Sequence, residues 1–173
     1  MPSGVQTSIG VKVSQQSTIY VANEALRTFI EIPTLRGLDS REITSNLEPI
    51  SRGFQTWTST RHLKKAHLEI FDPGTDMAVE RWDMVFNYEV DSAGQKSQFK
   101  TEMDKLKDFA SKLSKLRPGC RYRIVVDLDE GAPPVEGWEP TTLRDILHLG
   151  KRSFGGYIDT PRIKVAMEYW GES

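Results

Sequence analysis

The sequence predicts an α+β domain in which an antiparallel sheet packs on three helices. Apolar residues recur at spacings of three and four in the segments 17–33, 39–57 and 95–116, which is typical of amphipathic helices. Other segments alternate apolar and polar residues around turn sequences, as strands of a half-buried sheet do. Because such a sheet has one apolar and one polar face, we expect the helices on the apolar face only.

The first two helical segments carry clear boundary signals. Ser17 can cap the first helix, and Pro33 is expected to stop it. The second segment begins near Asp39 or Ser40. Pro49 and Gly53 lie inside it, so we predict a kink or two shorter helices. The apolar stripe of the first helix consists of Ile19, Ala22, Leu26, Phe29 and Ile30.

A β-hairpin is predicted from the run that ends at Phe71, the turn 72–76 and the run Val79–Val90. A third helix over 95–116 should cover part of its apolar face. A further strand follows at Tyr122–Leu128, then a Pro- and Gly-containing loop, and then a closing hairpin. In the second run, Trp82, Met84, Phe86, Tyr88 and Val90 share one face, while Arg81, Asp83, Asn87 and Glu89 share the wetter one.

Bulk composition narrows the function. The chain has 173 residues, 38% of them hydrophobic and 27% charged, which is ordinary for one globular domain. A net charge of −1 gives no field that would favour nucleic acid or a membrane surface as partner. We see no leader and no apolar run near the ~18 residues that span a bilayer. Cys120 is the single cysteine, so a reducing cytoplasm is the expected setting.

Catalytic patterns are weak, and we do not expect an enzyme, a metal or a cofactor. The three histidines show no metal-ligand spacing, and Cys120 has no evident base partner. One constellation keeps an alternative open. Asp127 and Asp129 lie two apart on a strand, with Asp83 as a third ligand, as in a small Mg²⁺-dependent phosphoryl- or nucleotidyl-transfer enzyme.

Three stretches, in order, resemble a HORMA domain: "VERWDMVF" at 79–86, "VEGWE" at 135–139, and "KRSF" with "IKVAMEYW" within 151–170. The compact loops look most like the bacterial branch associated with CBASS antiphage signalling. The resemblance implies an N-terminal tail over 1–17 and one HORMA domain over 18–173. Its core would be 18–131, and its mobile C-terminal "safety belt" 132–173.

In HORMA proteins the belt has two positions, which assigns roles here by resemblance. In one state it pairs with the strand 122–128; in the other it crosses to the strand 79–90, and a guest peptide takes the vacated edge. The implied peptide-binding residues are Tyr122, Arg123, Ile124, Val125, Val126, Asp127 and Leu128. The implied belt residues are Trp138, Phe154, Gly155, Gly156, Tyr157, Val165, Met167 and Tyr169, with the two glycines as places to bend.

The resemblance also implies partners. A closure-motif peptide would hold the closed state, which would activate a cGAS-like cyclic-oligonucleotide nucleotidyltransferase. An AAA+ remodeller would reopen it by engaging the tail, through Val5, Ile9, Val11 and Val13. Alternatively, the tail could be the closure strand of a second HORMA copy. A HORMA-like adaptor that does not switch is the other open possibility.

Overall fold

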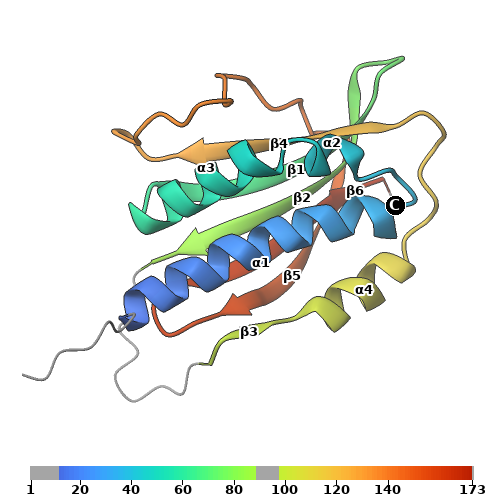
Figure 1. The fold of residues 1–173 in the computed structure, drawn as a ribbon. Helices are drawn as coiled ribbons and strands as arrows, with labels where there is room; N and C mark the ends of the chain where they lie inside the picture. Colours follow the sequence, from blue (N-terminus) through green and yellow to red (C-terminus); the bar gives the residue numbers. More distant parts are fainter. Residues whose placement is uncertain (1–11, 89–97, 173) are drawn as a thin grey trace, which may run out of the picture.

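The computed structural model describes residues 12–88 and 98–172 and confirms the α+β class, with helices over one face of a curled antiparallel sheet (Figure 1). The helices are α1 (Val13–Leu35), α2 (Arg41–Thr44), α3 (Leu47–Ser59) and α4 (Met103–Ser111). The strands are β1 (Leu63–Asp72), β2 (Met77–Asn87), β3 (Lys100–Thr101), β4 (Arg121–Leu128), β5 (Gly150–Asp159) and β6 (Lys164–Gly171).

All six strands join one sheet in the order β3-β5-β6-β2-β1-β4. Leu68 of β1 lies opposite Trp82 of β2 on one side and Ile124 of β4 on the other, while Trp82 lies opposite Tyr169 of β6. These four side chains form one row facing the helices, because residues paired across strands share a face. The predicted hairpin and the predicted third strand are thereby confirmed.

Aromatic contacts fix the helical layer to the sheet and to itself. Phe29 of α1 meets Phe54 of α3 with ring centroids 6.0 Å apart, and Phe109 of α4 meets Trp82 of β2 at 5.7 Å. Figure 1 shows α1 across the middle of the sheet, α3 toward β4 and α4 toward β5. Within the described ranges, no helix is long and apolar enough to cross a membrane.

The ends of the first helices differ in detail from the prediction. Helix α1 begins at Val13, so Ser17 is a buried residue of its second turn rather than its cap. It runs past Pro33 to Leu35 and ends where Gly37 adopts a φ of +76°. The following stretch is two helices, α2 and α3, which is one of the two predicted outcomes, but the break precedes Pro49 and Gly53, and both of these residues lie inside α3.

Helix α4 is shorter than the predicted 95–116 segment, part of which lies outside the described residues, as does the Val90 end of the second hairpin strand. Residues Lys100–Thr101 pair with Ile158 and Asp159 of β5, and the N–H of Glu102 donates to the Tyr157 carbonyl at 2.8 Å. This pairing with the closing hairpin overrides the local helical spacing, so the helix begins at Met103.

The face of the sheet opposite the helices is polar but not open, which corrects the prediction of a wetter face. His67, Glu69 and Asp83 on that face are each no more than 1% exposed. Contacts from residues 141–148 show that the segment before β5 crosses this face. Charged groups are therefore buried there and must be paired.

Candidate peptide-binding edge

Strand β4 is one of the two edge strands of the sheet, and β3 is the other. One side of it pairs with β1 along its length, and within the described ranges no strand pairs with the other side. The closing hairpin instead lies at the far side of β2, where β6 pairs with it from Glu80–Gly171 to Asn87–Lys164. An uncovered edge offers backbone N–H and C=O groups to an incoming strand. The closing hairpin therefore lies beside β2 and leaves the outer side of β4 without a strand, which matches the arrangement that the resemblance associates with a guest peptide.

The loop after β4 first runs along α3. The indole N–H of Trp57 donates to the Pro133 carbonyl at 2.7 Å, and that of Trp138 donates to the Pro49 carbonyl at 2.8 Å. Figure 1 shows this loop on the free side of β4. The chain then reaches the opposite face of the sheet.

There, the Arg123 guanidinium of β4 donates to Thr141 Oγ1 at 2.8 Å and to the Thr142 carbonyl at 2.6 Å. The loop therefore touches the helical layer at Trp138 and the opposite face at Thr141. Between these points it passes around the free edge of β4.

A buried carboxylate binds the loop where it crosses the polar face of the sheet. Glu69 of β1, 0% exposed, accepts from the backbone N–H of Arg144 at 2.7 Å, from the Arg144 guanidinium, and from Arg123 Nε at 2.7 Å. The Arg144 guanidinium also stacks over the Phe71 ring, 3.6 Å from its centroid. Charge-assisted contacts of this kind hold the loop to strands β1 and β4 of the sheet. The sequence analysis did not predict the contact between Glu69 and Arg144, because these two residues lie 75 positions apart.

A second buried carboxylate holds β6. Glu80, 2% exposed, accepts from Arg36 Nε and Nη2 at 2.8 and 2.9 Å, from Trp82 Nε1 at 2.9 Å and from Tyr169 Oη at 2.9 Å. Burial and the adjacent Glu80 charge raise the pKa of Tyr169, which keeps the hydroxyl protonated and able to donate. Sequence reasoning also missed this group. Its signal was a glutamate on the apolar face of a strand, two residues before Trp82.

Trp138 is seated on α3 by a glycine. A Cβ added at Gly53 would lie 2.6 Å from Trp138 Nε1 and 2.8 Å from the Trp57 ring. The indole also meets the rings of Phe54 and Trp57, at centroid distances of 6.3 and 5.1 Å. Trp138 therefore has one defined position against the helix, which fixes the first part of the loop.

The structure places the residues implied by the resemblance as follows. On β4, Tyr122, Ile124, Val126 and Leu128 face the helices, while Arg123, Val125 and Asp127 face away. Gly155 and Gly156 lie beside irregularities in the β5–β6 pairing, and Gly155 has a φ of +87°. Val13 opens α1, and Val5, Ile9 and Val11 lie outside the described residues. The belt side chains buried in the core are Phe154, Tyr157, Val165, Met167 and Tyr169.

The aspartates of the Mg²⁺ hypothesis do not converge. Asp83 lies 2.7 Å from Nδ1 of His67, and Asp127 lies 3.1 Å from Nε2 of the same imidazole. Asp129 is instead 3.7 Å from Lys64 Nζ. The imidazole separates Asp83 from Asp127, and across the described part of the chain no three His, Cys, Asp or Glu side chains are grouped to hold a metal ion. The expectation of Asp83 as a third ligand is wrong.

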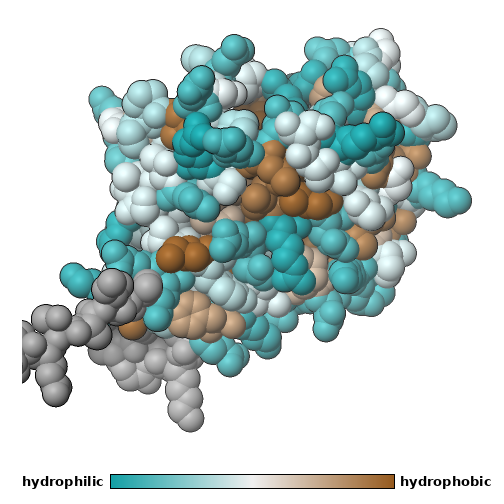
Figure 2. Space-filling model, in the orientation of Figure 1, coloured by the Kyte–Doolittle hydropathy of each residue, from teal (hydrophilic) through white to brown (hydrophobic). Residues whose placement is uncertain are grey.

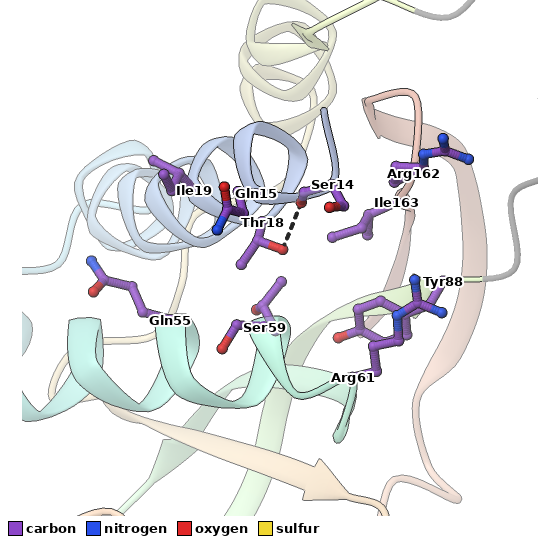
Figure 3. A pocket seen from close by; sticks show the side chains of 11 residues that line it. Ser14, Gln15, Thr18, Ile19, Gln55, Ser59, Arg61, Tyr88, Arg162 and Ile163 are labelled. Atoms are coloured by element: carbon purple, nitrogen blue, oxygen red, sulfur yellow. Dashed lines mark hydrogen bonds between the residues drawn. The ribbon is translucent and has the colours of Figure 1, made fainter. Parts of the chain in front are cut away.

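Among the cavities of the described residues, two concern the β4 edge and the start of α1. One, of about 430 Å³, lies beside the first half of β4, between it, α2–α3 and Trp138. Another, of about 670 Å³, lies at the start of α1 (Figure 3). Its walls include Ser14 and Thr18 of α1, Arg61 after α3, and Arg162 and Ile163 of the β5–β6 turn. The turn of the closing hairpin and the first turns of α1 therefore line the same cavity.

Comparison with known proteins agrees with this fold. The family described as Bacterial HORMA domain 2 matches residues 6–173. The chain belongs to this family. Among solved structures, a chain of the mitotic checkpoint complex superposes on this HORMA domain with a TM-score of 0.71 at 13% identity, covering 94% of this chain and 99% of that one.

Two Caenorhabditis elegans proteins have the same fold. HTP-2 bound to the HIM-3 closure motif gives a TM-score of 0.62 at 16% identity, with coverage of 96% and 94% of the two chains. HTP-1 bound to the HIM-3 closure motif gives 0.58 at 18% identity, with coverage of 92% and 91%. No curated protein matches this HORMA domain.

Proposed function

We propose that this HORMA domain is a peptide-binding switch, in which a partner's closure peptide adds to β4 beneath the belt. The observation that carries the proposal is the free β4 edge with the belt passing around it, from Trp138 on one face to Thr141 on the other. The solved HTP-2 and HTP-1 structures, each bound to a closure motif, support the same use of the fold. Strand addition gives affinity through backbone hydrogen bonds and specificity through alternate side chains.

The energies are compatible with switching. A guest that adds ~5 backbone hydrogen bonds gains ~0.5–1.5 kcal/mol from each. Moving a two-state equilibrium from mostly open to mostly closed requires about 5.5 kcal/mol of differential binding. A short peptide can therefore supply the free energy that holds the belt closed.

The test is to pan a random dodecapeptide library against the full chain and to map the selected peptides by amide hydrogen exchange. We expect alternate amides of Tyr122–Leu128, those that point away from β1, to become protected. Peptides that protect the cavity at the start of α1 instead, or no selected peptide at all, would contradict peptide binding at β4.

For the wider role, the bacterial branch that the sequence resembles suggests antiphage signalling. In this proposal the closed, peptide-bound form activates a cGAS-like nucleotidyltransferase, and an AAA+ ATPase reopens it by pulling the N-terminal tail. The shared cavity of α1 and the β5–β6 turn supports a route from the tail to the belt. Removing residues 1–11 should abolish ATPase-driven opening and spare peptide binding. Unchanged opening would exclude the tail as the handle.

Two other arrangements are distinguishable. If Val5–Val13 is the closure strand of a second copy, assembly will depend on protein concentration and disappear with the same truncation. If the protein is an adaptor that does not switch, ion exchange and NMR will show one conformer with and without peptide. Two slowly exchanging conformers would support the switch.

A further inference from the structure

The cavity beside β4 lies where a guest strand would send side chains toward the helices. Its floor is Tyr122 and Ile124 of β4, and its roof is Gly137 and Trp138 of the belt. The volume is about 430 Å³. The α2–α3 segment supplies the remaining wall, with Ile43, Pro49 and Ile50 as its apolar members.

We propose, resting on the proposed function, that this cavity selects guests by taking one large apolar side chain. In an added strand, successive side chains alternate between the two faces of the sheet. One of every two guest side chains therefore points to the helical face, on which Ile124 lies. The guest residue beside Ile124 enters the space bounded by Ile43, Ile50 and Trp138.

Three polar groups of the wall already donate to carbonyls of the protein, which disfavours a polar guest residue. Asn46 Nδ2 donates to the Glu42 carbonyl at 2.7 Å, and Tyr122 Oη donates to the Asp39 carbonyl at 2.5 Å. The Trp138 indole N–H donates to the Pro49 carbonyl, so Trp138 presents its ring to the cavity. A polar side chain placed there would lose its water without gaining an equal set of hydrogen bonds.

The charged groups at the rim are also paired with each other. Arg121 Nη2 lies 3.2 Å from Glu42 Oε1, and both side chains are about half exposed or more, at 61% and 49%. Arg123 is engaged by Glu69 and the belt. The charges at the rim are of both signs and are exposed to solvent, so they discriminate less between guests than the apolar surfaces of Ile43, Ile50 and Trp138 do.

The closing experiment uses the selected dodecapeptides and a variant that fills the cavity. Each peptide is scanned by substitution, and affinities are measured by fluorescence anisotropy for the wild-type chain, Ile50→Phe, and the control Arg52→Phe on the exposed side of α3. We expect one position that requires a large apolar residue, where Ala weakens binding ~10-fold or more. Ile50→Phe should weaken the parent peptides but not their Ala-substituted versions, and Arg52→Phe should change neither.

A change in side-chain size preference distinguishes a specificity pocket from general damage to the fold. Peptides that protect β4 but tolerate Ala or Asp at every position would overturn the inference and leave the proposed function standing. Equal weakening of parent and Ala-substituted peptides by Ile50→Phe would also overturn it. If no peptide protecting β4 is recovered, both proposals fail.

Discussion

Replacing Tyr169 by Phe removes the hydrogen bond that ties β6 to the buried Glu80 carboxylate and leaves the ring in place. A hydrogen bond to a charged group contributes ~1.5–3 kcal/mol. Glu80 keeps Arg36 and Trp82 as donors in the variant, so the lower figure applies. A loss of ~1.5 kcal/mol corresponds to roughly a tenfold change in an equilibrium constant.

The assay is native-state amide hydrogen exchange, read separately on β6 and on β1. If the belt can leave while the core stays folded, β6 amides exchange through belt opening and β1 amides through global unfolding. Tyr169→Phe should accelerate the exchange of β6 amides and of β1 amides roughly tenfold, because belt opening and global unfolding both break the hydrogen bond between Tyr169 and Glu80.

Tyr88→Phe is the matched control. The Tyr88 hydroxyl donates to the Leu63 carbonyl at 2.7 Å, a contact between β1 and the end of β2 that belt opening preserves. Tyr88→Phe should accelerate the exchange of β1 amides ~5-fold, which corresponds to a loss of ~1 kcal/mol of global stability, and it should leave the exchange of β6 amides unchanged. If β6 amides respond to Tyr88→Phe as strongly as β1 amides do, the hairpin leaves only with the whole fold, and the belt reasoning is refuted.

Three further changes test the packing and electrostatics. Gly53→Ala should displace Trp138 and cost ~1–3 kcal/mol of stability despite better helix propensity, whereas Gly156→Ala, with open space around its Cβ, should not; tryptophan fluorescence and denaturant midpoints decide. Burial raises the pKa of Tyr157 to about 12. The free energy of unfolding should therefore fall as pH rises from about 10, where the unfolded tyrosine ionises, to about 12. Tyr157→Phe should flatten this loss of stability, and an unaltered slope in the variant would contradict the assignment. Burial alone would raise the pKa of Asp83, but its imidazole and guanidinium neighbours lower it, so it stabilises the fold above about pH 4 and loses that effect on acidification; the acid limb of Asp83→Asn should be shallower.

Local patterns were enough to predict every strand except β3, and the side of the sheet that faces the helices. The alternation of Trp82, Met84 and Phe86 is a property of neighbouring residues, and the structure buries all three. The long helix was overextended because Lys100–Thr101 pairs with β5, a contact that no local spacing reports.

The contacts that Glu69 and Glu80 make with the belt could not be predicted from local patterns. Glu69 and Arg144 meet only because the chain crosses the polar face of the sheet, and neither has a local motif. Glu80 was closer to being predictable. A charged residue on the same side of a strand as Trp82 must be buried, and a buried charge requires partners, but the sequence does not say that these are Arg36 and Tyr169.

The passage of the chain around β4 has a kinetic consequence. A guest seated at that border would be enclosed on both faces, so it could not depart until Arg144 separates from Glu69 and the loop moves away. Residence time would then be set by the protein's own opening rate. In most families of related complexes, affinity differences arise in dissociation. Here, closure peptides of different strength should dissociate at nearly one common rate and differ mainly in how fast they are captured.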